Sequence, residues 1–100
     1  MIEIKEKNSD MYIIISQRLD SMNADEAKET LTQALEHLKG KVIIDVSHLD
    51  YISSAGLQVI LKCAKIAKAQ QQECFLKGAH GTVREIFQVS GFLTFLKEIT

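Results

Sequence analysis

KVIIDVSHLDYISSAGLQVIL, residues 41–61, predicts a buried strand, a loop and the start of a helix in direct succession. KVIIDV is short and rich in β-branched residues without polar alternation, which is typical of a central strand covered on both faces. SHLDYI predicts a loop. Residues 54–70 predict a helix whose polar positions, Gln58, Lys62 and Lys65 among them, fall on a narrow arc. Because the rest of that helix surface is apolar or small, we expect the helix to pack deeply against a sheet.

Regular elements are also predicted on both sides of this unit. MIEIKEK alternates as a half-buried strand does, and the β-branched run MYIIISQRL predicts a second strand antiparallel to it. Residues 20–40 predict a helix in which Asn23 is the N-cap, Glu26 completes a capping box and Gly40 supplies the left-handed C-terminal residue. ECFLKG predicts a fourth strand, HGTVREIFQVSG a short helix that ends at Gly91, and FLTFLKEIT a half-turn and an edge strand.

The order of these elements is β-β-α-β-α-β-α, with an additional strand after the last helix. Helices that alternate with strands after an opening hairpin predict an α/β fold, in which a mixed central sheet is flanked by helices and the crossovers are right-handed. The chain has 100 residues and no proline. We see no linker, repeat or low-complexity segment, so residues 1–100 are expected to form a single domain.

The composition is that of a soluble globular protein, with 46% apolar and 25% charged residues. A net charge of −1 and dispersed lysines argue against nucleic acid as a direct partner, because phosphate neutralisation requires a concentrated basic surface. No apolar run is long enough to cross a membrane, and the N-terminus carries charges where a signal peptide needs apolar residues. We therefore expect no membrane association and a cytoplasmic location.

The residue types that support catalysis do not form a recognisable constellation. His37, His48 and His80 lie far apart and do not pair with other metal ligands at helical spacing. The glycines form no nucleotide-binding motif, and SSAG lacks the GxSxG pattern of a nucleophile elbow. Cys63 and Cys74 match neither a redox pair nor a zinc site, and they predict buried free thiols. We expect no metal, no cofactor and no enzymatic activity.

Two adjacent serines, Ser53 and Ser54, precede the second predicted helix. A serine at this place is a preferred helix cap, because its hydroxyl accepts a hydrogen bond from a free backbone N–H. The same place suits a phosphate group, because a helix N-terminus presents free N–H groups and a partial positive charge. The residues by themselves leave both interpretations open.

The segment KVIIDVSHLDYISSAGLQVIL resembles the signature segment of STAS domains, and the chain is similar over nearly its whole length to stand-alone bacterial anti-sigma factor antagonists. The family pattern [DS]-S-[STA]-G-L at the start of the second helix corresponds to the five residues from Ser53 to Leu57. The G-x-L-D element after the second strand appears as QRLD, with Asp20 in the acidic place. VREIFQVSGFLTFL resembles the third helix of the family and its SG[LF] ending.

This resemblance implies partner switching. Members of the family bind an anti-sigma factor serine kinase when unphosphorylated, which frees the sigma factor. The kinase phosphorylates the serine after the [DS] position, here Ser54 rather than Ser53, and a metal-dependent serine phosphatase reverses the modification. The partner-binding residues implied by the resemblance are Asp20, Ser53, Ser54, Gly56 and Gln58.

Two departures from the family pattern leave an alternative open. Ser53 stands where many members have aspartate, which removes a negative charge beside the acceptor and leaves two adjacent hydroxyls. Gln17 stands where the family often has glycine. The alternative is a STAS scaffold or small-ligand-sensing module that is not regulated by phosphorylation.

Overall fold

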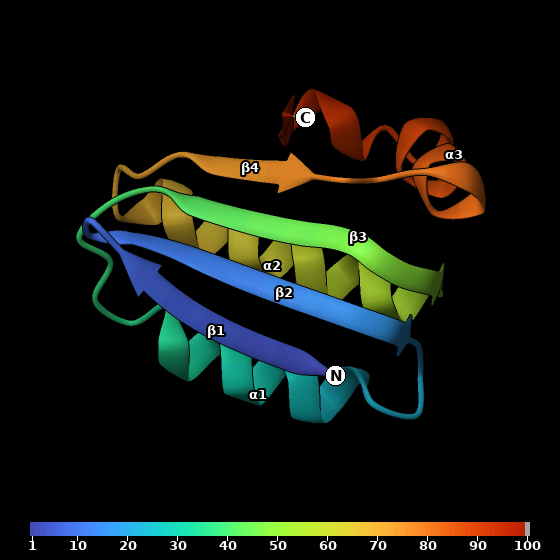
Figure 1. The fold of residues 1–100 in the computed structure, drawn as a ribbon, viewed down its shortest axis with the longest axis horizontal. Helices are drawn as coiled ribbons and strands as arrows, with labels where there is room; N and C mark the ends of the chain where they lie inside the picture. The colour runs from blue at the N-terminus through green and yellow to red at the C-terminus, as the bar shows by residue number, and fades with distance from the viewer. Residues whose placement is uncertain (100) are drawn as a thin grey trace.

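Five strands form one sheet in the order β1-β2-β3-β4-β5 in the computed structural model, which describes residues 1–99 (Figure 1). The elements, in chain order, are β1 (Ile2–Lys7), β2 (Asp10–Leu19), α1 (Ala24–Ala34), β3 (Val42–Ile52), α2 (Ser54–Ala69), β4 (Cys74–Lys77), α3 (Gly81–Val89), the 3₁₀ turn η1 (Phe92–Thr94) and β5 (Lys97–Ile99). The predicted α/β class and element order, including the final strand, are confirmed.

The sheet is mixed, as predicted. β1 and β2 are antiparallel, whereas β2, β3, β4 and β5 pair in parallel. Asn8 and Ser9 join β1 to β2 with φ angles of 53° and 72°, the left-handed conformations that a tight hairpin requires. Each later strand is reached through a helical crossover, which brings the carboxyl ends of β2 and β3 to the same end of the sheet.

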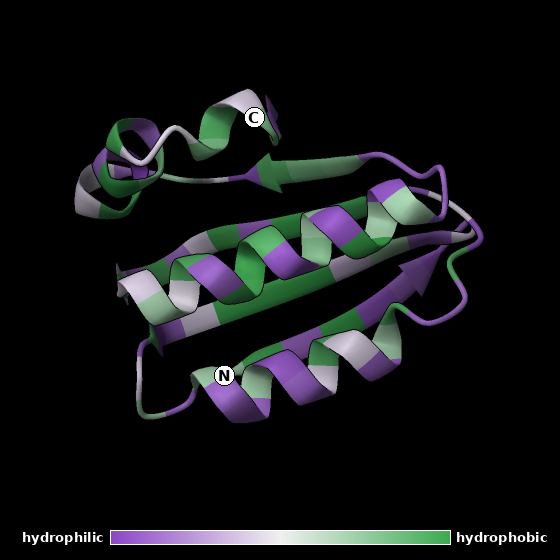
Figure 2. Cartoon of the chain, turned by 180° about the vertical axis from the view of Figure 1, so that it is seen from behind, coloured by the Kyte–Doolittle hydropathy of each residue, from purple (hydrophilic) through white to green (hydrophobic). Residues whose placement is uncertain are grey.

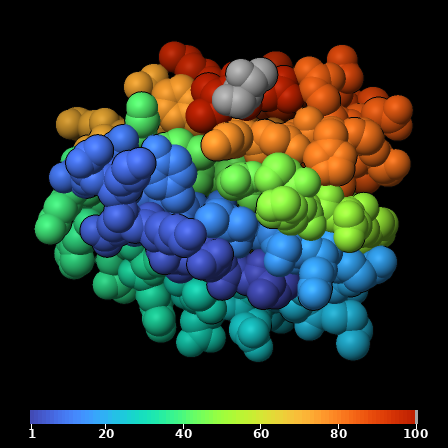
Figure 3. Space-filling view, viewed as in Figure 1, coloured from blue at the N-terminus to red at the C-terminus, as the bar shows by residue number. Residues whose placement is uncertain are grey.

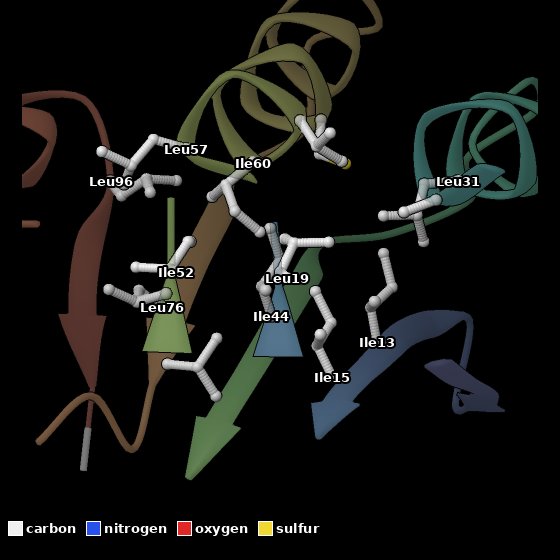
Figure 4. Close-up of a cluster of buried hydrophobic side chains, with 14 of the residues drawn as sticks. Ile13, Ile15, Leu19, Leu31, Ile44, Ile52, Leu57, Ile60, Leu76 and Leu96 are labelled. Carbon is white, nitrogen blue, oxygen red and sulfur yellow. The ribbon is translucent and has the colours of Figure 1, made fainter. Parts of the chain in front are cut away.

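The core lies between the sheet and the two long helices. α1 and α2 cover the same face of the sheet, as the views from the front and from behind agree (Figures 1 and 2). Ile13 and Ile44 point from the strands toward this layer, where Leu31 of α1 and Ile60 of α2 meet them (Figure 4). All four side chains are at most 1% exposed, so α2 packs deeply, as its broad apolar face predicts.

Neither long helix covers the opposite face of the sheet (Figure 3). Tyr12, Ile43 and Phe75 are paired across β2, β3 and β4, at positions that alternate with the core residues. Ile43 is only 2% exposed, while Tyr12 and Phe75 are half-buried. Flanking side chains rather than a long helix therefore cover β3 on this face, and β3 is buried on both faces, as predicted.

The second half of β3 was predicted as a loop, and the structure corrects this. β3 continues to Ile52 and pairs with β2 through two shifts of register. Leu49 and Ile52 are both buried, at 0% and 1% exposure, and they hold this polar segment against the core.

Helix α1 begins after Asn23, as predicted, but it is shorter than predicted because its C-terminal end lies elsewhere. It ends at Ala34, well before Gly40, because the side chain of Gln70 binds the end of the helix. The Gln70 amide donates to the carbonyl of Leu35 and accepts from the backbone N–H of Leu38. At the other end Asn23 occupies the N-cap position, but its side chain makes no capping bond.

Candidate functional site

The candidate site lies where the carboxyl ends of the parallel strands β2 and β3 meet, which is where α/β proteins commonly place functional residues. The turn from β2 to α1 and the start of α2 both leave the sheet at this end (Figure 1). A backbone hydrogen bond joins them, since the N–H of Ser53 donates to the carbonyl of Leu19 at 3.0 Å.

The two serines have different structural positions. Ser53 has an extended backbone, and its Oγ accepts a hydrogen bond from the N–H of Gly56 at 3.2 Å, so it is the N-cap of α2. Ser54 is the first residue of the helix and is exposed. Among residues 1–99, no side chain or backbone group forms a hydrogen bond with the Ser54 hydroxyl. The capping role and the accessible hydroxyl therefore belong to different serines.

Gly56 faces the sheet and is buried. A Cβ atom at this position would lie 2.5 Å from the carbonyl oxygen of Leu19 and 2.9 Å from Cγ1 of Ile52. Close packing of α2 on β2 therefore accounts for the glycine. Gly56 does not reach the exposed surface, and its geometry favours this packing role over direct partner binding.

Asp20 organises the turn that follows β2. Its carboxylate accepts hydrogen bonds from the backbone N–H of Met22 at 3.0 Å and from Nε of Arg18 at 3.2 Å. The bond from Met22 and then the bond from Arg18 hold the pKa of Asp20 below its ordinary value. The side-chain amide of Asn23 stabilises the same turn, because it accepts a hydrogen bond from the Asp20 N–H and donates one to the Arg18 carbonyl. Asp20 is thus a fixed anion at the edge of the site.

Sequence reasoning missed an aromatic and apolar surface at this end of the sheet. The guanidinium carbon of Arg18 lies 4.5 Å from the centre of the Tyr51 ring, a cation–π contact across paired positions of β2 and β3. Tyr51 is 39% exposed and Met22 is 92% exposed. The only sequence signal was Tyr51 itself, but the loop predicted for that segment left it without a register against Arg18.

Gln58 lines a groove between α1 and α2 that begins one residue after Ser54. The groove has a volume of about 420 Å³, and Ala55, Gln58 and Lys62 of α2 face Asp25 and Lys28 of α1 across it. This placement brings Gln58 to the surface that adjoins the serine pair.

Other chemical features are limited in the part of the chain that the structure describes. Residues 1–99 contain no group of three side chains arranged to hold a metal ion, and no helix there has the length and apolar character needed to cross a membrane. Cys63 and Cys74 are free, and burial raises the pKa of each thiol to about 12. Both thiols are free, as predicted; Cys63 is buried as predicted, whereas Cys74 is only half-buried.

Comparison with known proteins gives a consistent result. The family model for the STAS domain matches residues 1–99. The chain is 40% identical over 76 residues to the putative anti-sigma factor antagonist BtrV of Bordetella bronchiseptica, an alignment that spans 76% of this chain and 66% of that protein. It is 30% identical over 92 residues to the anti-sigma-B factor antagonist of Listeria monocytogenes, across 90% of this chain and 80% of that protein.

Solved structures share the fold at low sequence identity. The anti-sigma factor antagonist SpoIIAA in its unphosphorylated form superposes with a TM-score of 0.77 at 15% identity, over 100% of this chain and 88% of that one. A putative anti-sigma factor antagonist from Thermotoga maritima superposes with a TM-score of 0.89 at 17% identity, over 97% of this chain and 84% of that one.

Proposed function

This chain belongs to the STAS domain family, and from that membership we propose that it is an anti-sigma factor antagonist that acts by partner switching. Unphosphorylated, it binds an anti-sigma factor serine kinase and so relieves the sigma factor. Phosphorylation of Ser54 by that kinase releases the complex, and a metal-dependent serine phosphatase restores the binding form. Two relatives named as anti-sigma factor antagonists support the general role.

The observation that carries the proposal is the different position of the two serines. The Ser53 hydroxyl is engaged in capping α2, whereas the Ser54 hydroxyl is exposed at the first helical residue. A phosphate on Ser54 would meet the N-terminal end of a 16-residue helix, where backbone N–H groups and the helix dipole favour negative charge. The modified protein can therefore keep its fold while its surface changes.

The expected energies are sufficient for a switch. A phosphoserine brings about −1.5 to −2 charges. Met22, in the turn after β2, and Tyr51, near the end of β3, are exposed at the same end of the sheet and suit burial against a partner. Forcing that charge into a partly desolvated interface costs several kcal/mol, and each ~1.4 kcal/mol weakens binding tenfold. One modified serine can thus release a partner held in the micromolar to nanomolar range.

The fixed carboxylate of Asp20 is suited to a specific contact with a partner protein. Asp20 is held by its backbone and Arg18 bonds, so it presents a carboxylate with little conformational freedom. In this proposal Asp20 and Gln58 contact the kinase, and Ser53 positions the acceptor through the cap.

The test combines phosphosite mapping with partner capture from lysate of the native host. Wild-type chain, Ser53→Ala, Ser54→Ala and Ser54→Asp are incubated with ATP, and the modified residue is identified by tandem mass spectrometry. We expect phosphate on residue 54 in the wild type and in Ser53→Ala, and none in Ser54→Ala. As baits, the wild type and Ser54→Ala should retain an anti-sigma-type kinase that Ser54→Asp loses.

Two results would reject the proposal. Phosphate found on Ser53 in the wild type would reverse the assigned register. If all four baits retain the same partners and no serine is modified, phosphorylation plays no part, and the scaffold or ligand-sensing alternative takes its place.

A further inference from the structure

A second groove lies along α2 beside η1 and β5, and it shares Leu61 and Lys65 with the groove next to the serines. Its volume is about 510 Å³, larger than the groove next to the serines. Leu61, Ala64, Lys65 and Lys68 of α2 form one wall at the helical spacing i, i+3, i+4, i+7. This spacing covers two turns of one helix face, or about 10 Å along the axis. The groove thus has the length of a short helix–helix contact.

The floor and outer wall of this groove are apolar. Leu61, Ala64 and Cys74 are half-buried along it. Phe95, which directly follows η1, also lines the groove, and 68% of its surface is exposed. A phenylalanine this exposed beside three partly covered apolar side chains forms a continuous surface that gains free energy when covered.

The rim of the groove is positively charged. Lys65 and Lys68 lie on consecutive turns of α2, and neither forms an ion pair with any residue that the structure describes. Lys97 lines the opposite side and pairs with Glu73 at 3.2 Å, so that charge is balanced. The net potential along the α2 wall is therefore positive.

We infer that this groove docks an amphipathic helix of a partner protein, with apolar residues facing Phe95 and carboxylates facing Lys65 and Lys68. Apolar grooves in helical walls receive such helices at i, i+3, i+4, i+7 positions, and the free lysines select acidic flanks. Among the described residues, β5 presents the short segment Lys97–Ile99 at its edge, whereas α2 presents two turns of helix to the groove. Ser54 does not line this groove, so the contact is independent of the proposed phosphorylation.

The experiment selects ligands from a displayed library of amphipathic helices, with leucines fixed on one face and flanking positions randomised, against the full chain. We expect enriched sequences to carry aspartate or glutamate on the flanks. Their affinity, measured by fluorescence anisotropy with synthetic peptides, should fall at least tenfold for Phe95→Ser and for the double variant Lys65→Glu/Lys68→Glu. The matched control Lys62→Glu, on the same helix but lining the first groove and not the second, should change affinity less than twofold, as should Ser54→Asp.

Three outcomes would overturn the inference. The library yields no enriched family, or the enriched flanks are neutral or basic, or the double variant binds as tightly as the wild type. In the first case, amide shifts of Leu61 and Ala64 on adding decanoate would instead assign the groove to a small amphiphile. Melting temperatures of all variants are measured first to confirm that each variant folds. Every altered residue is exposed, so we expect folding to be retained.

Discussion

Replacing Gly56 by alanine should destabilise the protein, although alanine is the better helix former. The added Cβ would lie 2.5 Å from the carbonyl oxygen of Leu19, which is backbone and already accepts the Ser53 N–H at 3.0 Å. Relief requires the first turn of α2 to move away from β2. Overpacking of this kind costs about 1–3 kcal/mol, and the strained backbone hydrogen bond adds about 1 kcal/mol.

The higher helix propensity of alanine offsets about 1 kcal/mol of this destabilisation. The net loss in the free energy of unfolding is therefore about 2 kcal/mol, which lowers the Tm of a 100-residue domain by roughly 8–16 °C. Urea and thermal unfolding followed by circular dichroism measure both quantities.

The matched control is the exposed mid-helix position Lys62, where Lys62→Ala should be about 1 kcal/mol more stable than Lys62→Gly. At position 56 the order of alanine and glycine should reverse. A Gly56→Ala protein as stable as the wild type would show that the close approach of α2 to β2 does not restrict this position.

Three further substitutions or conditions test the same structure. Ser53→Ala should lower the free energy of unfolding by about 1 kcal/mol, because it removes the helix cap. Ser54→Ala should change it by less than about 0.5 kcal/mol. Equal losses for the two variants in urea unfolding would contradict the assignment of the cap. Gln17→Gly should raise the free energy of unfolding by about 0.5–1 kcal/mol. Gln17 has a φ of 71°, and the strain that glycine removes there exceeds the free-energy cost of the greater flexibility that glycine gives the unfolded chain. A lower Tm would refute this. Burial raises the pKa of Cys63 and Cys74 to about 12 from an ordinary value of 9.0. Between these pH values the folded thiols keep protons that the unfolded chain releases. The free energy of unfolding should therefore be highest below pH 9 and should decrease as the pH rises toward 12. Cys63→Ala should show a shallower loss in urea unfolding over that range, and an unchanged slope would argue against the buried thiol as its source.

Elements with a strong local pattern could be predicted from the sequence. The periodicity of α2 and the β-branched runs of β2 and β3 are local properties, and the left-handed Gly91, with a φ of 79°, ends α3 as predicted. A serine cap at the start of α2 could also be predicted, whereas the structure identifies Ser53 as the serine that accepts from the N–H of Gly56.

Features that depend on distant residues could not be predicted. The end of α1 is set by Gln70, a residue at the far end of another helix. Asn23 forgoes its expected cap because the turn beside Asp20 uses its side chain. The Arg18–Tyr51 contact requires the register of β2 against β3, which shifts twice and has no signal in either strand alone.

Gln17 connects the family pattern to the structure. A glycine is common in the family at this position, and the φ of 71° explains why a residue without a side chain suits it. The glutamine therefore marks a place where this chain accepts backbone strain at the entrance to the turn that holds Asp20.

A single residue, Ser53, connects the end of β3 to the beginning of α2. The central strand thus anchors Ser54 rigidly, and no flexible tether lets the side chain reach into an enzyme's cleft as an unfolded peptide would. Any enzyme that modifies Ser54 in the native protein must recognise a three-dimensional epitope rather than a linear consensus. A synthetic peptide copying residues 50–57 would lack the strand, the cap and the neighbouring turn, and would be a poor substitute for the folded domain as a substrate.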